Sequence, residues 1–316
     1  MKVLANDGIA LSGVKALEAA GFEVDLSTVA QDQLVAYINN EQISVLLVRS
    51  ATKVRTDIID NCPDLKIIGR GGVGMDNIDV AYAREKGLHV INTPAASSHS
   101  VAELVFAHLF GMARFLHVSN RQMPLEGDAK FKELKKAFAK GIELKGKTLG
   151  LIGFGRIGQA TAKIGLGLGM KVIAFDPFID EAHLELEFFD HQSLIFTIQT
   201  LSKEAVLQEA DFISLHVPAQ EDYVLSTKEF DLMKTGACLV NAARGGVVDE
   251  PALIAAIDSG KVAKAALDVF ENEPTPEIQL LMNPNLSLSP HIGAATGEAQ
   301  DRIGTELAEQ IIDLLG

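Results

Sequence analysis

The chain of 316 residues is long enough for two domains of ordinary size, and its 47% hydrophobic and 22% charged residues are typical of a well-cored globular protein. Its formal net charge of -14 argues against nucleic acid as a partner, because the phosphate backbone repels an acidic surface. The same charge means that an anionic substrate would need a local basic pocket.

Two features of the sequence indicate the compartment. The first seven residues resemble a short strand that soon becomes charged, unlike a signal peptide, and no apolar run approaches membrane-spanning length. Cys62 and Cys238 lie far apart beside apolar stretches, so we expect buried free thiols, as in a reducing compartment. We therefore expect a cytoplasmic protein without a membrane partner.

The first ninety residues alternate short apolar stretches with helical patterns. The expected strands are Lys2–Ala5, Glu23–Leu26, Ser44–Val48, Lys66–Ile68 and His89–Ile91. The expected helices between them are Leu11–Ala20, Asp32–Ile38, Thr56–Asn61 and Val80–Lys86. Gly21 and Gly87 stand where helices should stop. This alternation predicts a parallel sheet with helices on both faces.

A capping-box pattern, Ser100-Val-Ala-Glu103, predicts the start of a long apolar helix over Val101–Phe115. The lysine-rich segment Met123–Glu143 is expected to be a surface excursion with helical turns. A second alternating series follows, with the six strands of a full dinucleotide-binding sheet. These strands are expected at Leu149–Ile152, Val172–Phe175, Phe212–Leu215, Cys238–Val240, Ala265–Leu267 and Leu286–Leu288.

A glycine fingerprint, Gly153-Phe-Gly-Arg-Ile-Gly158, lies between the first strand of this series and a helical stretch. The next strand ends at Asp176, about 20 residues past the glycines, as the dinucleotide-binding pattern requires. Gly153 permits a tight turn, Gly155 lets backbone approach a pyrophosphate, and Gly158 allows close packing of helix on strand. An acid at position 176 would bind ribose hydroxyls and repel a 2′-phosphate, which predicts NAD as the cofactor.

Two segments lie outside the alternation. Leu184–Phe188 and Leu194–Ile198 each alternate apolar and polar residues, which predicts a β-hairpin inserted in the dinucleotide domain. The last segment, Glu298–Leu315, is an amphipathic helix that belongs to neither series by order. It could return to the amino-terminal domain, which would make that domain discontinuous.

Three reactive residue types follow successive strands of the second series. Arg244 precedes two glycines, and a guanidinium can grip a carboxylate with two hydrogen bonds. His291 offers a proton carrier near neutral pH, and a carboxylate partner would orient it. Glu271 and Glu273 both follow a neighbouring strand, and their spacing leaves the choice of partner open. Together these groups predict reversible oxidation of a secondary alcohol that carries a carboxylate.

The motifs Gly153–Gly158, His216–Pro218, Asn241–Glu250, Leu267–Pro274 and Ser289–Thr296 occur in the order and form that resemble the D-isomer-specific 2-hydroxyacid dehydrogenases. The resemblance covers nearly the whole chain. It implies an α/β fold of two doubly wound parallel-sheet domains, with a Rossmann domain (99–291) inserted into a flavodoxin-like substrate domain (1–98 plus 292–316).

The resemblance also implies residue roles. The family's catalytic arginine, glutamate and histidine fall on Arg244, Glu273 and His291. The expected NAD contacts are Gly153, Gly155, Arg156, Ile157, Gly158, Asp176, His216, Val217, Pro218, Asn241, Ala242, Ala243, Asp268, His291 and Gly293. The expected substrate contacts are Arg49, Ser50, Arg70, Gly71, Gly72, Val73 and Arg244. No metal site is expected.

The amino-terminal half is most similar to the family members that oxidise 3-phospho-D-glycerate to 3-phosphohydroxypyruvate, the first step of L-serine synthesis. Arg49 and Arg70 would hold the phosphate, and we expect a short form without the regulatory domain of longer members. The alternatives are a glyoxylate or hydroxypyruvate reductase, another D-2-hydroxyacid dehydrogenase, or an NAD(H)-sensing binding protein like the family's corepressors. A homodimer or homotetramer is expected.

Overall fold

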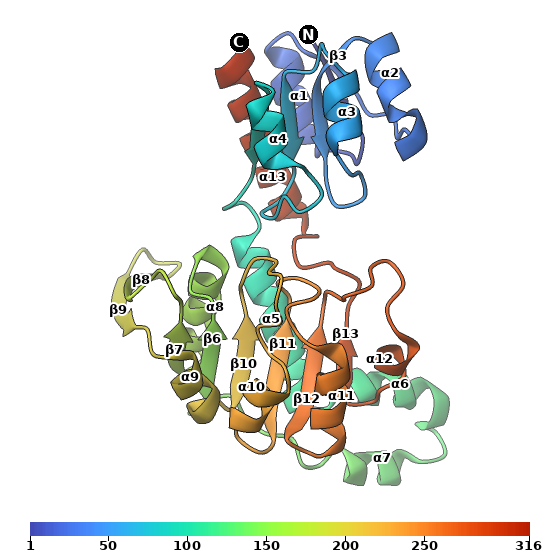
Figure 1. The fold of residues 1–316 in the computed structure, drawn as a ribbon. Helices are drawn as coiled ribbons and strands as arrows, with labels where there is room; N and C mark the ends of the chain where they lie inside the picture. Colours follow the sequence, from blue (N-terminus) through green and yellow to red (C-terminus); the bar gives the residue numbers. More distant parts are fainter. The chain divides into compact units, whose positions relative to one another are not determined.

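The computed structural model describes all residues, 1–316, and divides them into two compact units. Unit 1 comprises Met1–Ser100 together with Ala294–Gly316, and unit 2 comprises Val101–Gly293. Figure 1 shows a sheet with helices in each unit. The chain therefore has the predicted α/β architecture with two parallel sheets.

Unit 1 contains a five-stranded parallel sheet in the order β2-β1-β3-β4-β5. This is the strand order of flavodoxin-like folds. The strands are β1 (Lys2–Ala5), β2 (Glu23–Asp25), β3 (Ile43–Val48), β4 (Ile67–Arg70) and β5 (His89–Asn92). The strands match the predicted series to within two residues at each end.

Helices cover both faces of the first sheet, because its strands are apolar on both sides. One face packs against α2 (Leu34–Asn40), α3 (Thr56–Asn61) and α4 (Val80–Glu85), and the other against α1 (Leu11–Ala19) and α13 (Gly297–Leu315). Helix α13 thus returns to the amino-terminal part of the chain, as its sequence position suggested. Gly13 and Gly304 meet where α1 and α13 cross, and a Cβ on Gly13 would lie 2.6 Å from the Gly304 carbonyl oxygen.

Unit 2 contains a six-stranded parallel sheet in the order β13-β12-β11-β10-β6-β7. Its strands are β6 (Thr148–Ile152), β7 (Lys171–Phe175), β10 (Phe212–Leu215), β11 (Ala237–Asn241), β12 (Val262–Leu267) and β13 (Leu286–Leu288). Strand β7 lies on one side of β6, and the strands from β10 onward lie on its other side, so the strand order switches between β6 and β10. Open α/β sheets bind ligands at such a switch point, beyond the carboxyl ends of the strands.

The predicted hairpin is confirmed as β8 (Glu181–Glu187) paired antiparallel with β9 (Ser193–Gln199). Its apolar face, with Leu184, Leu186 and Ile198, is buried in the same core as α8 (Arg156–Gly167). After the hairpin, Thr200 forms a single parallel bridge to Ala174 of β7. A dinucleotide-binding sheet of the order 3-2-1-4-5-6 has its third strand at this position, so the hairpin takes the place of most of that strand.

Helices also cover both faces of the second sheet (Figure 1). One face carries α5 (Ser98–Ala113) and α8. The opposite face carries α9 (Lys203–Glu209), α10 (Thr227–Leu232) and α11 (Glu250–Asp258). The remaining helices are η1 (Gln31–Gln33), α6 (Leu116–Glu126), α7 (Phe131–Ala137) and α12 (Ile278–Leu281). The lysine-rich excursion is thus partly helical, as predicted.

The predicted capping box at Ser100 is wrong. Helix α5 already begins at Ser98, and the Ser100 hydroxyl lies 2.7 Å from the hydroxyl of Thr296, far along the chain. A long-range hydrogen bond has replaced the local one. The predicted helix end is also too late, because α5 stops at Ala113 and Phe115 adopts a left-handed φ of 57° that starts α6 in a new direction.

Cys62 and Cys238 are buried free thiols, as predicted, and burial raises the pKa of each to about 11. No single helix has the length and hydropathy of a bilayer span, although α5 and α6, bent by 60° at their junction, together reach those values.

The helix crossing at Gly13 gives a stability prediction. Gly13→Ala should lower the free energy of unfolding by roughly 1–3 kcal/mol, because the added methyl group meets backbone that cannot yield. Gly297→Ala, in the first turn of α13, is the matched control, since its methyl group would meet open space. Urea unfolding of both variants measures the difference, and equal midpoints would contradict the packing described here.

Candidate active site

The fingerprint glycines form a tight backbone cradle at the end of β6. Gly153 has a φ of 94°, and a Cβ there would overlap the carbonyl oxygen of His216. A Cβ on Gly158 would meet the Gly153 carbonyl oxygen, whereas one on Gly155 would meet nothing within 4 Å. Only the middle glycine therefore faces open space, where the pattern places the pyrophosphate.

Helix α8 begins directly after Gly155, and no side chain caps its amino terminus. Its first backbone N–H groups can therefore serve an anion, which the positive end of the helix dipole also attracts. With the open space at Gly155, this is the arrangement that a dinucleotide pyrophosphate needs. The residues present fit NAD.

Asp176 lies at the end of β7 and has two hydrogen bonds within the protein. Its Oδ2 accepts the N–H of Phe154 at 2.7 Å, and its Oδ1 accepts the N–H of Phe178 at 2.9 Å. The carboxylate thus holds the fingerprint turn against β7, in addition to the ribose contact that the sequence predicts. This structural bond was not foreseen from the spacing of the motif.

His216 begins the segment His216–Pro218, which follows β10 at the switch point. Its backbone N–H donates to Ile152 O at 2.8 Å, so the segment extends the sheet beside the fingerprint. Both ring nitrogens are buried without a hydrogen-bond partner, and burial lowers the pKa of the imidazole to about 3. The ring is therefore neutral at physiological pH.

Arg244 follows β11 in a turn that the protein holds from two sides. Asn241 organises the turn, since its side chain donates to Arg244 O at 2.9 Å and accepts the N–H of Ala243 at 3.1 Å. A Cβ on Gly245 would overlap the Phe270 carbonyl oxygen, so only glycine lets the turn pack this closely on the loop after β12. The Arg244 guanidinium donates to Ala243 O at 2.6 Å and contributes to lowering the pKa of Glu273.

His291 and Glu273 form a hydrogen-bonded pair, with 2.8 Å between Nδ1 of the imidazole and Oε2 of the carboxylate. The other carboxylate oxygen, Oε1, accepts the N–H of Phe270 at 3.0 Å. Burial acts to raise the pKa of Glu273, but the hydrogen bond and charge of His291 outweigh it, and the pKa is lowered. The carboxylate is therefore ionised at neutral pH, and it accepts a proton only as the pH falls through that lowered value.

The structure also separates the two acids between which the spacing could not decide. Glu271 turns the other way: its Oε1 lies 3.4 Å from the N–H of Glu250, and the Glu250 carboxylate accepts the N–H of Glu271 at 2.9 Å. Glu250 is buried, and its contacts with Glu271 anchor the loop after β12 to α11. Glu273 is therefore the acid that pairs with the imidazole of His291. The sequence offered no signal for this anchoring role of Glu250.

Asp268 is almost fully buried at the end of β12. Its carboxylate accepts the hydroxyl of Ser289 at 2.6 Å and the N–H groups of Ile292 and Gly293 at 2.9 and 2.8 Å. It therefore holds the chain on both sides of His291. Its expected contact with the cofactor stays a prediction.

The predicted phosphate-binding residues lie in unit 1. Val48 pairs with Arg70 across β3 and β4, so Arg49 and Arg70 stand at neighbouring strand ends. The N–H of Arg49 donates to Asp7 at 2.6 Å. The Arg70 guanidinium lies over the turn of Gly71 and Gly72, in the space that a side chain at position 72 would occupy.

Ser50 is exposed and Val73 is half-buried on the same edge of the sheet. The predicted substrate residues of unit 1 therefore cluster at the carboxyl ends of its strands. The predicted catalytic residues follow the carboxyl ends of strands in unit 2.

A pocket of about 430 Å³ adjoins the His291–Glu273 pair. Its lining is largely apolar and consists of Phe270, Glu273, Pro274, Pro276, Leu281, Leu288, Ser289, Pro290 and His291.

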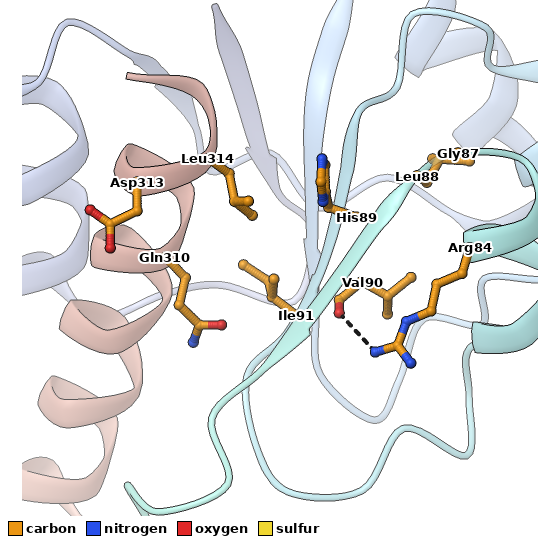
Figure 2. Close-up of a pocket in the computed structure, with 9 residues that line it drawn as sticks. All are labelled: Arg84, Gly87, Leu88, His89, Val90, Ile91, Gln310, Asp313 and Leu314. Carbon is orange, nitrogen blue, oxygen red and sulfur yellow. Dashed lines mark hydrogen bonds between the residues drawn. The ribbon is translucent and has the colours of Figure 1, made fainter.

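A second pocket, of about 620 Å³, lies in unit 1 beside the edge strand β5 (Figure 2). It contains none of the predicted site residues. Arg84 donates to Val90 O at 3.4 Å there (Figure 2). Nearby, Gln310 donates to Asn92 O at 3.0 Å. Such side-chain caps protect a free sheet edge from pairing with another chain.

Comparison with known proteins identifies the family. Residues 106–293 match the D-isomer specific 2-hydroxyacid dehydrogenase, NAD binding domain. The chain is 48% identical over 300 residues to hydroxypyruvate reductase of Thermotoga maritima, covering 93% of this chain and 91% of that protein. It is 42% identical to D-3-phosphoglycerate dehydrogenase of Methanocaldococcus jannaschii, covering 100% of this chain but 57% of that protein.

A solved structure of D-lactate dehydrogenase from Aquifex aeolicus, complexed with NAD and lactic acid, is also similar. Its TM-score is 0.75 at 27% identity, covering 100% of this chain and 95% of that one. The fingerprint cradle, the acid at the end of β7 and the histidine–glutamate pair are thus found in a chain whose sequence and fold both match one group of enzymes. The protein belongs to the D-isomer-specific 2-hydroxyacid dehydrogenases, which are NAD-dependent oxidoreductases.

Proposed function

We propose that the protein interconverts a phosphorylated D-2-hydroxy acid and its 2-oxo acid, with 3-phospho-D-glycerate and 3-phosphohydroxypyruvate as the pair. The observation that carries the reaction is the 2.8 Å hydrogen bond between His291 and Glu273 beside the Arg244 turn. The substrate assignment is supported by Arg49 and Arg70 at adjacent strand ends, and by the relatives named D-3-phosphoglycerate dehydrogenase. This reaction would be the first step of L-serine synthesis.

In the oxidation, His291 takes the hydroxyl proton of the substrate through Nε2, since Nδ1 is bound to Glu273. The substrate C–H bond breaks as the C=O bond forms, and bound NAD supplies the hydride acceptor. Glu273 stabilises the imidazolium that results. In the reverse direction the imidazolium returns the proton to the same oxygen.

Arg244 has the positioning role in this scheme. Its guanidinium would hold the substrate carboxylate and polarise the oxygen at C2, and its turn is fixed by Asn241 and by the close contact at Gly245. In unit 1, the backbone N–H groups of Gly71, Gly72 and Val73 are the donors that we propose for a substrate anion. We assign unit 1 as the substrate domain and unit 2 as the cofactor domain.

Hydroxypyruvate reduction is the second candidate. It is favoured by the 48% identity to a hydroxypyruvate reductase of nearly the same length. The two substrates differ by one phosphate group. The two candidate functions are therefore distinguished by whether Arg49 and Arg70 bind that phosphate. Both reactions use the same catalytic residues.

We also propose that the protein is a homodimer or homotetramer in the cytoplasm. Apolar side chains on α5 to α7 are substantially exposed, including Phe110, Leu116, Leu125 and Phe131. Several large apolar side chains exposed on neighbouring helices of the chain are consistent with a surface that another copy covers.

The substrate assignment predicts a rate difference. With NADH, the purified protein should reduce phosphohydroxypyruvate with a kcat/KM at least about tenfold above those for hydroxypyruvate and glyoxylate, since one bound phosphate contributes a charge-assisted interaction of more than about 1.4 kcal/mol. Initial rates at 340 nm measure this. Equal or reversed values would reject the phosphorylated substrate in favour of hydroxypyruvate.

The catalytic assignment predicts the effect of removing the base. His291→Ala should lower kcat by roughly 10²–10⁴-fold while the NADH dissociation constant, measured by fluorescence, stays near normal. The exposed His183 on the hairpin provides the matched control, and His183→Ala should retain full activity. Arg244→Lys should lower kcat/KM despite its conserved charge, because the two-pronged hydrogen bond is lost. Full activity in His291→Ala would remove the residue from the mechanism.

Because Asp176 both holds the fingerprint turn and is predicted to contact the ribose, two substitutions should distinguish its effect on stability from its effect on cofactor preference. Asp176→Asn keeps an oxygen for the Phe154 N–H but loses the charge and the acceptor for the Phe178 N–H. It should therefore raise the KM for NAD and narrow the preference for NAD over NADP, while lowering the melting temperature less than Asp176→Ala does. Asp176→Ala should change cofactor preference in the same direction and also destabilise the fingerprint turn. Unchanged cofactor preference in both variants would show that the acid does not face the ribose.

A further inference from the structure

A buried hydrogen-bond chain connects helix α5 to the loop that carries His291. Nδ1 of His108 lies 2.9 Å from the hydroxyl oxygen of Ser287, and Nε2 lies 3.0 Å from that of Ser289. The Ser289 hydroxyl lies 2.6 Å from Asp268 Oδ1. All four side chains are at most 9% exposed, so no member of the chain can exchange its partner for bulk water at low cost.

The chemistry of the groups fixes the direction of every bond in the chain. An ionised carboxylate only accepts, so Ser289 donates its proton to Asp268 and its oxygen accepts from Nε2–H of His108. Burial lowers the pKa of His108, against the opposing charge of Asp268 and aided by the nearby His117. A neutral imidazole with its proton on Nε2 has Nδ1 free to accept from Ser287. All the donors therefore point toward Asp268.

Asp268 in turn constrains the backbone around the catalytic histidine. His291 has a φ of 55°, in the left-handed region that residues other than glycine rarely adopt. The carboxylate binds the Ser289 side chain on one side of that residue and the N–H groups of Ile292 and Gly293 on the other. One buried carboxylate therefore holds the chain before and after His291 and so stabilises its left-handed backbone conformation.

We propose that His108 is a positioning residue, which acts through Ser289 and Asp268 to keep His291 in the backbone conformation that meets Glu273. This role rests on the proposed function of His291. Without the donor on His108, the Ser289 hydroxyl could turn away and Asp268 would lose one of the groups that fix its carboxylate. The loop would then sample conformations in which the His291–Glu273 bond is not formed.

His108→Leu tests this role, because leucine fits an apolar helix and removes both nitrogens. We expect kcat to fall about tenfold, a loss of about 1.4 kcal/mol, with the KM for NADH within twofold of wild type. Hydrogen exchange, followed by mass spectrometry, should become faster in peptides that cover residues 289–293. His108→Gln retains a donor and an acceptor and should restore kcat to within threefold and exchange to near the wild-type rate.

The matched control is His183→Leu, since His183 is an exposed histidine on the hairpin, outside the chain of bonds from His108, and it should leave both readouts unchanged. If His108→Leu does not fold, Ser289→Ala takes its place, because it removes the bond to Asp268 and leaves the imidazole intact. Unchanged kcat and exchange in the folded variant would overturn the proposal. So would a His108→Gln variant as impaired as His108→Leu.

The exchange measurement separates this proposal from the proposed function. A wild-type protein without turnover on any 2-hydroxy acid would reject the proposed function. Faster exchange at 289–293 in His108→Leu would still establish the link between α5 and the loop, whereas unchanged exchange would reject it.

Discussion

The carboxyl ends of parallel strands gather every polar group on which the proposed chemistry depends. In unit 2, Gly153, Asp176, His216, Arg244 and Asp268 each stand at or just beyond the end of a strand. The strands themselves are largely buried on both faces, and none of the three predicted catalytic residues lies within a strand. Side chains from segments more than 100 residues apart are therefore brought to one edge by a rigid sheet.

Close backbone contacts fix this edge further. The Gly153 turn rests on the His216 carbonyl, and the Gly245 turn rests on that of Phe270. Carboxylates then hold the loops in place: Asp176 the fingerprint, Glu250 the loop after β12, and Asp268 the chain around His291. Acidic side chains thus stabilise the loops of this protein, which is consistent with its high content of Asp and Glu.

The sequence predicted nearly all strands and most helices, because apolar stretches buried on both faces are distinct from the amphipathic segments between them. It failed where a distant contact replaced a local one. Ser100 has the form of a helix cap, but its partner is Thr296. The six strands of unit 2 were predicted, but their order in the sheet was not. In the usual order 3-2-1-4-5-6 a third strand would lie beside β7, and here the hairpin and the single bridge at Thr200 stand in that position.

The catalytic candidates could be located from the sequence, but their partners could not. Spacing allowed either Glu271 or Glu273 to bind His291, and only the resemblance to a family chose between them. The geometry that distinguishes them is the turn of Glu271 toward Glu250. The hydrogen-bond chain from His108 could not be predicted for the same reason, because a histidine on an apolar helix gives no sign of the residue it contacts 179 positions later.

If the substrate carries both a carboxylate and a phosphate, as we propose, a protein of net charge -14 needs a local source of positive charge to bind it, and Arg49 and Arg70 stand at neighbouring strand ends where they could provide it. The most direct test compares kcat/KM for phosphohydroxypyruvate with that for hydroxypyruvate before and after replacing both arginines by glutamine. We predict a ratio well above one that falls at least about tenfold in the double variant, almost entirely through the phosphorylated substrate. A ratio that the double variant leaves unchanged would contradict the account.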